Sequence, residues 1–153
     1  MKLTIRTTSP EETTALGEEL GKLLAPGDVV ALYGDLGAGK TTLTRGIAVG
    51  LGLAADIHSP TFTLIHEHPG AIPLYHIDLY RLSNEREAES LGVEEYVYGD
   101  GVTVIEWGEK VQSILPAERL DITVRMTGDT DRELTLETES ERLSEAIRGL
   151  VRG

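Results

Sequence analysis

The sequence has no cysteine, few aromatic residues and fewer basic than acidic side chains. Without cysteine, the chain has neither disulfides nor thiolate metal ligands, which is consistent with a reducing compartment. The 14 Lys and Arg residues against 26 Asp and Glu residues give a formal net charge of −12. Because such a charge repels phosphate backbones, direct and extensive contact with nucleic acid is disfavoured.

Long apolar runs are also missing. No stretch approaches the roughly 18 apolar residues that suggest a membrane-spanning helix, and residues 1–12 lack the apolar core of a signal peptide. We therefore expect a soluble, cytoplasmic protein. The chain has 153 residues, of which 40% are hydrophobic, and this suffices for one ordinary core. A single domain over residues 1–153 is expected.

Strand and helix patterns alternate through most of the chain. A short alternating segment at 2–7 precedes a helix that starts at Pro10, with Ser9 as N-cap and Glu12 three residues after it. Continuous apolar runs at 29–34 and 101–107 predict strands that are buried on both faces. Between them, a helix is expected to end at the glycines Gly50 and Gly52, and a further strand is expected at 72–82, followed by a polar helical segment.

The C-terminal part has a different pattern. Two alternating segments, 120–126 and 132–138, flank a turn and predict a hairpin, and a helix follows over about 139–151 with Thr138 and Glu141 as a capping box. The whole order predicts an α/β fold. We expect a three-layer sandwich with a mixed, mainly parallel central sheet, to which the C-terminal hairpin and helix are added.

A glycine-rich motif occupies residues 34–41. It matches the phosphate-binding pattern G-x-x-x-x-G-K-[ST] and lies between a predicted buried strand and a predicted helix. Glycines let backbone N–H groups approach phosphate oxygens, Lys40 would neutralise the β- and γ-phosphates, and Thr41 would offer a hydroxyl to Mg²⁺. Together with the alternating strands and helices, the motif predicts a fold of the P-loop NTPase type. It predicts nucleotide binding by Asp35, Leu36, Gly37, Ala38, Gly39, Lys40, Thr41 and Thr42.

Two acidic residues, Asp78 and Glu106, stand at the ends of predicted buried strands. A P-loop enzyme needs a carboxylate on a neighbouring strand to hold the metal, and a group that positions the attacking water. Either residue fits either role, and an ordinary strand-end carboxylate is the alternative for each. Because parallel strands bring their C-terminal ends to the edge where the phosphate loop lies, the pair predicts a catalytic Mg²⁺ site beside Lys40.

Residues 58–62, with the sequence HSPTF, follow the helix after the phosphate loop. In switch-type NTPases a loop at this point brings a Thr hydroxyl to the metal and the γ-phosphate. Thr61 is placed in chain order to bind both. Ordinary Ser-Pro-Thr turn chemistry explains the segment equally well.

Sequence elements of related enzyme classes are missing. A guanine-specific GTPase usually carries Asn-Lys-x-Asp, but the single asparagine, Asn84, is followed by Glu85, and no Asp-x-x-Gly is present. ATP is therefore favoured over GTP. Small-molecule kinases commonly close an arginine-bearing lid over their substrates, and here the arginines are scattered without such an insertion. An ATPase is favoured, with a small-molecule kinase or a non-hydrolysing nucleotide-dependent interaction module as alternatives.

The histidines, the single tryptophan and an acidic segment have no clear catalytic pattern. Trp107 directly follows Glu106, and a place near the nucleotide and an ordinary half-buried aromatic position are both open. The acidic segment 84–96 predicts a solvated helix face. Because no metal-ligand spacing occurs on a predicted helix, surface or loop positions are expected for His58, His66, His68 and His76.

Four motifs follow one another along the chain. They are GDLGAGKTTLTRG at 34–46, SPTFTL at 59–64, YHIDLYRL at 75–82 and IEWGEK at 105–110. The first motif alone is generic, but the four in this order and at these spacings are specific. They resemble the TsaE (YjeE) family of small bacterial ATPases, and the resemblance extends over nearly the whole chain.

The resemblance implies an ATP-hydrolysing accessory subunit for the formation of threonylcarbamoyladenosine at position 37 of tRNA. Members of the family bind a complex of the transferase TsaD with its paralogue TsaB, and ATP turnover resets that complex between catalytic cycles. The resemblance also implies indirect contact with tRNA and weak ATPase activity without partners. By position, Lys40 and Thr41 would bind phosphate and Mg²⁺, Thr61 would sense the γ-phosphate, Asp78 would act on the metal side, and Glu106 would support hydrolysis.

Overall fold

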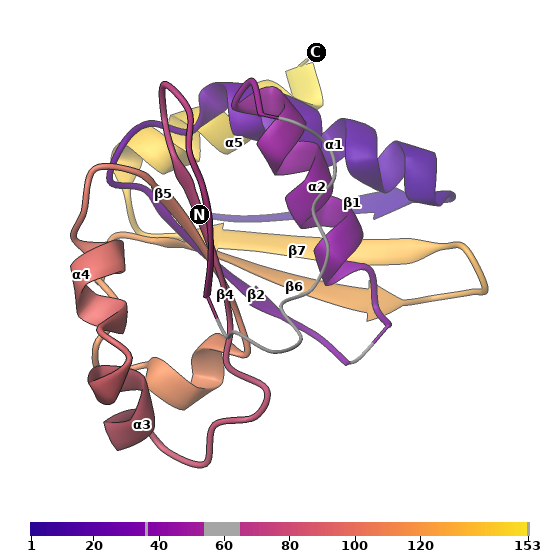
Figure 1. Ribbon diagram of the computed structural model, residues 1–153. Coiled ribbons are helices and arrows are strands. Elements are labelled where there is room, and N and C mark those ends of the chain that lie inside the picture. The colour runs from indigo at the N-terminus through magenta and orange to yellow at the C-terminus, as the bar shows by residue number, and fades with distance from the viewer. Residues whose placement is uncertain (36, 54–64, 153) are drawn as a thin grey trace.

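The computed structural model describes residues 1–35, 37–53 and 65–152 of the chain. Strands and helices alternate as expected (Figure 1). Their bounds are β1 Lys2–Thr7, α1 Pro10–Leu23, β2 Val29–Tyr33, α2 Lys40–Gly50, β3 Ile65–His68, β4 Leu74–Asp78, α3 Glu85–Ser90, α4 Val93–Val97, β5 Val102–Glu106, the 3-10 helix η1 Gly108–Val111, β6 Leu120–Met126, β7 Arg132–Thr138 and α5 Glu141–Arg152.

The strands form one seven-stranded sheet in the order β1-β7-β6-β2-β5-β4-β3. Strand β2 pairs in parallel with β5 and β6, and β5 pairs in parallel with β4. Strands β7 and β3 are antiparallel to their neighbours, so β1, β6, β2, β5 and β4 all run in one direction. The prediction of a mixed, mainly parallel sheet is therefore confirmed. The carboxyl ends of β2, β4 and β5 lie at one edge of the sheet.

Helices cover both faces of this sheet. Figure 1 shows α1, α2 and α5 on one side, and α3, α4 and η1 on the other. Each side has its own apolar core: one joins the first helix set to strand residues such as Val30 and Leu32, and the other joins the second set to Val29 and Ala31. Residues 29–32 are fully buried because adjacent residues of one strand point to opposite covered faces. The three-layer prediction is confirmed.

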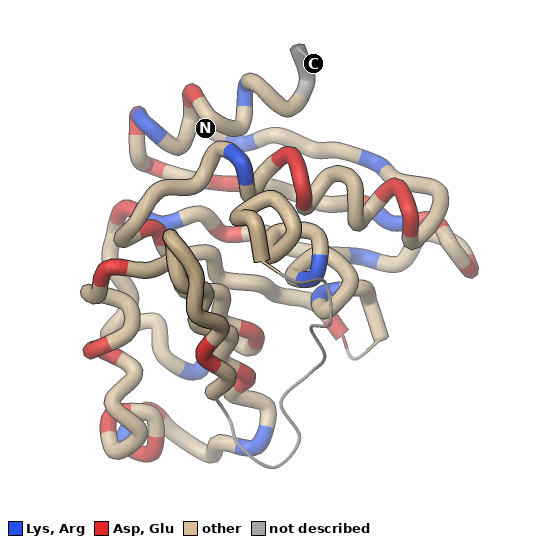
Figure 2. The backbone as a smooth tube through the Cα atoms, turned by 45° about the horizontal axis from the view of Figure 1, so that its top comes forward, with Lys and Arg blue, Asp and Glu red and all other residues tan. Residues whose placement is uncertain are grey.

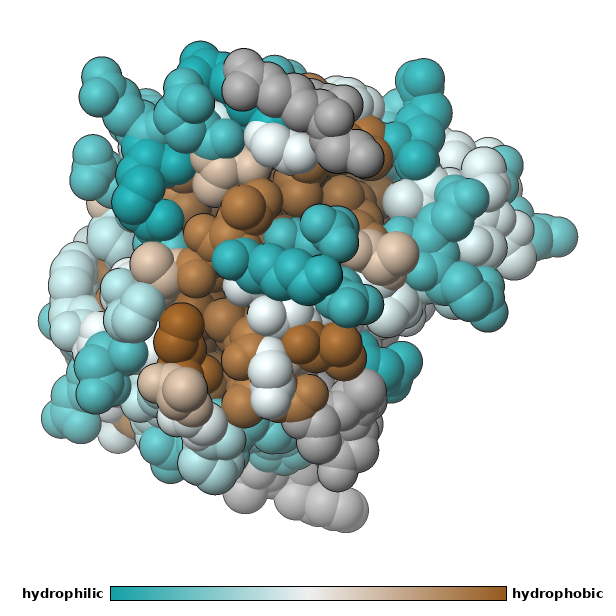
Figure 3. All heavy atoms as spheres, turned by 90° about the horizontal axis from the view of Figure 1, so that it is seen from above, coloured by the Kyte–Doolittle hydropathy of each residue, from teal (hydrophilic) through white to brown (hydrophobic). Residues whose placement is uncertain are grey.

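Apolar side chains also reach the surface on the side of α1 and α5. Figure 3 shows them between polar residues on this face. Leu16 of α1 and Leu150 of α5 are half-buried and pack against the core, and Leu23 of α1 is 38% exposed. None of the helices in the described ranges combines the length and the apolar content needed to cross a bilayer.

Helices α1 and α2 pack unusually closely, and glycine makes this possible. A Cβ atom on Gly46 would lie 2.2 Å from the carbonyl oxygen of Thr14, and a Cβ atom on Gly17 would lie 2.5 Å from that of Leu43. Gly21 and Gly50 form a second contact of the same kind one turn further along. A side chain at any of these four glycines would push α1 and α2 apart.

Most helix ends follow the sequence prediction. Ser9 Oγ accepts a hydrogen bond of 3.1 Å from the Glu12 amide, so Ser9 is the N-cap of α1 as predicted. Helix α2 ends at Gly50, and Gly52 follows in the left-handed region at φ +85°. The polar helical segment is divided into α3 and α4, because Gly92 adopts φ +75° between them.

The prediction of a capping box at Thr138 and Glu141 is wrong. Helix α5 begins at Glu141, and Ser140 Oγ accepts from the Leu143 amide at 3.2 Å. Thr138 is still the last residue of β7, and its hydroxyl donates to the Arg119 carbonyl at 2.8 Å. Ser140, two residues later, can also act as an N-cap. Because Ser140 lies beyond the end of β7, it caps the helix in place of Thr138.

Candidate functional site

The phosphate loop connects the end of β2 to the start of α2. Gly34, Gly37 and Gly39 have φ values of +138°, +80° and +110°, which non-glycine residues rarely adopt. The Ala38 amide donates to the Asp35 carbonyl at 3.1 Å, which closes a turn within the loop. The N-cap residue of α2 is Gly39, which has no side chain to accept hydrogen bonds from the backbone amides of the first turn. This arrangement is suited to binding an anion such as phosphate.

Lys40 is the buried cation of the site. Its side-chain nitrogen donates to the Gly34 carbonyl at 2.7 Å and lies 4.0 Å from the centroid of the Trp107 ring. The residue is 4% exposed, and burial lowers the pKa of its ammonium group, while the negative charge of Glu106 partly offsets that effect. A phosphate group beside it would restore the favourable interactions that burial removes.

Asp78 and Glu106 are neighbours across the parallel strands β4 and β5. They are register partners, and each is the last residue of its strand. One oxygen of Asp78 accepts from the Tyr80 amide at 3.0 Å. Burial raises the pKa of Asp78, the Tyr80 hydrogen bond opposes this, and the charge of Glu106 raises it further. The two carboxylates thus form a compact negative pair at the sheet edge.

His76 contacts Glu106 inside the protein. Its Nε2 atom lies 2.6 Å from Glu106 Oε2, and the two side chains are 0% and 4% exposed. An ionised carboxylate only accepts hydrogen bonds, so Nε2 is the donor. The other ring nitrogen, Nδ1, is buried and has no hydrogen-bond partner among the described residues. The expectation of a surface or loop position for His76 is wrong, because alternate residues of β4 face a covered side of the sheet.

A cavity of about 200 Å³ brings the predicted groups together. It is lined by Gly37, Gly39, Lys40, Thr41, Thr42, Asp78 and Glu106. Asp35 and Ala38 instead line a hollow on the other side of the loop, together with Gly34 and residues of β6. Leu36 and Thr61 lie outside the described residues.

Trp107 has a strained backbone. It adopts φ +65°, the only positive φ of a non-glycine residue in the part of the chain that the structure describes. The ring stacks at a tilt on Tyr80, with centroids 5.1 Å apart. Such a conformation costs free energy and is often kept at functional sites. The indole lies against the Lys40 ammonium beside the phosphate loop, near the first of the two positions that the sequence left open.

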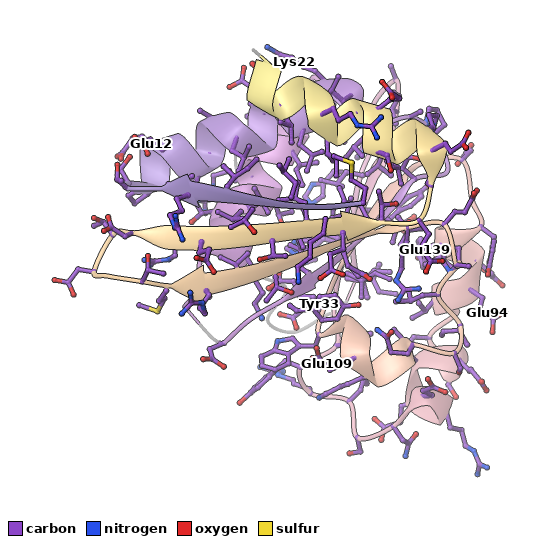
Figure 4. All side chains as sticks on the ribbon, turned by 180° about the vertical axis from the view of Figure 1, so that it is seen from behind. Glu12, Lys22, Tyr33, Glu94, Glu109 and Glu139 are labelled. Atoms are coloured by element: carbon purple, nitrogen blue, oxygen red, sulfur yellow. The ribbon has the colours of Figure 1, made fainter. Side chains whose placement is uncertain are left out.

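A polar network fixes the segment after Trp107. The Tyr33 hydroxyl donates to Asp121 at 3.0 Å and accepts from the Gln112 amide at 2.9 Å. The Arg119 guanidinium donates hydrogen bonds to Asp121 Oδ1 at 2.9 Å and to Gln112 Oε1 at 3.0 Å. Figure 4 shows Tyr33 beside η1, which this network ties to strand β6. Because Tyr33 directly precedes Gly34, the same contacts connect the phosphate loop to the segment that carries Glu106.

Charge is distributed unevenly around the site. Figure 2 shows acidic residues concentrated along α3 and α4. Glu87, Glu89, Glu94 and Glu95 are exposed, which agrees with the predicted solvated face. Among the described basic residues, Lys40 is the one that lines the cavity beside the phosphate loop.

These groups can perform phosphate chemistry together. The loop and the N-terminus of α2 supply amide donors, Lys40 supplies a positive charge, and Thr41 supplies a hydroxyl. Asp78 and Glu106 supply oxygen ligands of the kind that Mg²⁺ prefers, and an acceptor for a water proton. The donor set therefore fits a nucleoside triphosphate with Mg²⁺.

Comparisons with known proteins point to one protein family. The model of the family described as "Threonylcarbamoyl adenosine biosynthesis protein TsaE" matches residues 7–134. The crystal structure of YdiB from Bacillus subtilis superposes with a TM-score of 0.83 and 42% identity, over 99% of this chain and 95% of that one.

Two curated relatives carry the same name, tRNA threonylcarbamoyladenosine biosynthesis protein TsaE. The one from Bacillus subtilis is 50% identical over 131 residues, which cover 85% of this chain and 82% of that protein. The one from Treponema pallidum is 46% identical over 128 residues, covering 84% and 95%. Because the family model matches most of the chain and these two curated members are 50% and 46% identical to it, the protein belongs to the TsaE family.

Proposed function

We propose that this protein hydrolyses ATP as an accessory subunit in the formation of threonylcarbamoyladenosine in tRNA. The observation that carries the proposal is the cavity in which the phosphate loop meets Asp78 and Glu106. A phosphate loop alone holds a nucleotide. The two carboxylates beside it supply what hydrolysis needs in addition, a metal-side ligand and a group that positions water.

The surroundings of the two carboxylates favour a division of labour. Glu106 is 3% exposed and one of its oxygens is held by His76, so the other has a fixed direction in which to accept a proton from water. Asp78 is half-buried at the cavity wall and has one oxygen on the Tyr80 amide. We therefore assign Glu106 to the attacking water and Asp78 to the metal side.

Mg²⁺ would be held by Thr41 and Asp78, with Thr61 as a further candidate, and it would neutralise the charge that builds on the phosphate oxygens. The chain's own groups do the rest. Lys40 and the loop amides bind the phosphates. The centroid of the Trp107 ring lies 4.0 Å from the Lys40 ammonium nitrogen, so the indole limits where that ammonium group can move. Burial of Lys40 and Glu106 excludes bulk water from their side of the cavity.

The proposed partners are TsaD and TsaB, with ATP turnover resetting their complex between catalytic cycles. A net charge of −12 suits a subunit that contacts protein while its partners hold the tRNA. The names of the relatives support the pathway, since they describe tRNA threonylcarbamoyladenosine biosynthesis proteins.

Phosphate release tests this function. The purified protein is incubated with ATP and Mg²⁺, with and without TsaD and TsaB, alongside Lys40→Ala and Glu106→Ala. We expect turnover that increases with the partners and falls to background in both variants. Turnover with the partners that does not exceed that of Lys40→Ala would refute the proposal. A stoichiometric phosphorylated product would instead indicate a small-molecule kinase, and tight binding without turnover would indicate a nucleotide-dependent interaction module.

A further inference from the structure

The C-terminal hairpin, β6 and β7, reaches the back of the phosphate loop. Arg132, the first residue of β7, donates from Nε to the Ala38 carbonyl at 2.7 Å across a separation of 94 residues. At the other end of the loop, a Cβ atom on Gly34 would lie 2.4 Å from the carbonyl oxygen of Val124 in β6. Both ends of the loop therefore rest on the hairpin.

Arg132 is itself held firmly. Its NH1 group donates to the carbonyls of Asp131, Gly128 and Asp129 at 2.9, 3.2 and 3.4 Å. These residues form the turn between β6 and β7, which the Thr127 amide closes on the Asp131 carbonyl at 3.0 Å. One guanidinium thus links the turn of the hairpin to the loop, a geometry that its several donors in one plane make possible.

The bond to Ala38 matters because of the peptide that it fixes. The Ala38 carbonyl and the Gly39 N–H belong to one planar trans peptide, so they point in opposite directions. Gly39 lines the cavity with Lys40, and its φ of +110° leaves this peptide free of the steric limits that a Cβ imposes. Holding the carbonyl at the back therefore directs the Gly39 N–H toward the cavity at the front.

The charge of Arg132 is also not neutralised by a carboxylate. Within the described ranges its hydrogen bonds all go to backbone carbonyls, and it forms no ion pair there. Other arginines of the same sheet do pair: Arg6 and Arg125 both contact Glu133, at 3.1 and 2.9 Å. A cation behind the loop adds to the favourable potential for an anion in front of it.

We propose that Arg132 is a positioning residue of the phosphate loop, which holds the Ala38 carbonyl so that the Gly39 amide is directed at the bound phosphates. The inference rests on the proposed nucleotide binding. It gives the C-terminal hairpin a role at the site, although none of its residues lines the cavity that holds Lys40.

The test is the affinity of the full chain for MgADP, measured by isothermal titration calorimetry. The variants are Arg132→Met and Arg132→Lys, with Arg6→Met as a control that removes the same charge from an exposed position on β1. We expect affinity to fall about tenfold or more in Arg132→Met, since a hydrogen bond from a charged group is lost, and to fall less in Arg132→Lys. Arg6→Met should bind like the wild type.

A second readout does not depend on nucleotide. In ¹⁵N-labelled protein, the Gly39 amide resonance should shift in both Arg132 variants and stay unchanged in Arg6→Met. Arg132→Met that binds MgADP as tightly as Arg6→Met, or Arg132→Lys with wild-type affinity and an unchanged Gly39 amide, would overturn the proposal. If Arg132→Met does not fold, Arg132→Lys decides by the same two measurements. If the wild type itself does not bind MgADP, phosphate release still decides the proposed function, and the Gly39 resonance alone decides the role of Arg132.

Discussion

Helix α2 has two neighbourhoods of opposite kinds. Along its side it packs against α1 through glycines, where backbone atoms of one helix lie close to backbone atoms of the other. At its N-terminus it faces Asp78 and Glu106 across a cavity that also contains the buried ammonium of Lys40. The first region stabilises the fold by close packing, whereas the second holds charged groups that burial penalises.

The difference predicts opposite responses to mutation. In the helix pair, adding a single methyl group should destabilise the protein, because the neighbouring atoms are backbone and cannot move aside. In the site, removing a carboxylate charge should impair function without destabilising the fold, as is common where a site needs groups that the fold disfavours. Four substitutions test this contrast, in decreasing order of their expected effect.

Gly46→Ala should lower the free energy of unfolding by about 3 kcal/mol or more, because the new Cβ would lie 2.2 Å from the Thr14 carbonyl oxygen. Urea unfolding measures the change. Gly149→Ala is the matched control: it lies in α5, its nearest neighbour to a new Cβ is a side-chain atom of Leu23 at 3.9 Å, and it should gain up to about 1 kcal/mol of helix propensity. Equal effects of the two substitutions would contradict the packing account.

Glu106→Gln should reduce ATP turnover with TsaD and TsaB by about 100-fold or more, because the amide cannot accept a proton from water. Its thermal midpoint should stay close to that of the wild type, since the amide oxygen can still accept from His76 Nε2. Phosphate release and a thermal melt on the same sample measure the two quantities. Wild-type turnover in this variant would remove Glu106 from the proposed chemistry.

His76→Leu should reduce turnover by roughly tenfold, because Glu106 loses the donor that fixes its orientation. It should also destabilise the protein by about 1–3 kcal/mol, as a buried carboxylate is left without its partner. His76→Gln can place an amide N–H near the position of Nε2 and should recover most of the turnover. Nucleotide affinity should be unchanged in both variants. If Leu and Gln give equal turnover, His76 has only a packing role.

Asp78→Asn should slightly raise the free energy of unfolding at neutral pH. Burial raises the folded-state pKa of Asp78 above its ordinary value of 3.8, so the unfolded chain ionises first and ionisation favours unfolding as pH rises. The gain from Asn should therefore be present at pH 7 and vanish below about pH 3, where Asp78 is neutral in both states. Urea unfolding at the two pH values measures it. A loss of stability at pH 7 would mean that the Tyr80 hydrogen bond outweighs the cost of burial.

Much of the fold could be predicted from local sequence. The period of the apolar residues located the strands and helices, and Ser9 and Gly52 marked helix ends through their own backbone chemistry. The prediction for α5 failed by two residues, because Thr138 and Ser140 offer the same cap and only the end of β7 decides between them. Local sequence patterns therefore predict where a helix or strand lies better than they predict its first residue, when two neighbouring residues could both act as the cap.

The candidate site could be predicted only in part. Lys40, Asp78 and Glu106 were found because each follows a signal within its own segment, a glycine-rich loop or the end of an apolar run. His76 and Arg132 carry no such signal. The side chain of His76 points from β4 toward a covered face of the sheet. Arg132 contacts Ala38 of the phosphate loop, which lies 94 residues earlier in the chain.

The phosphate loop, the order of strands and helices, and the net negative charge follow from the sequence alone, because each depends on neighbouring residues or on composition. The tertiary structure settled which groups meet: Glu106 with His76, Trp107 with Lys40, and Arg132 with Ala38. It also decided that glycines would join α1 to α2. These contacts depend on strand order and register, which bring together residues that no local pattern relates.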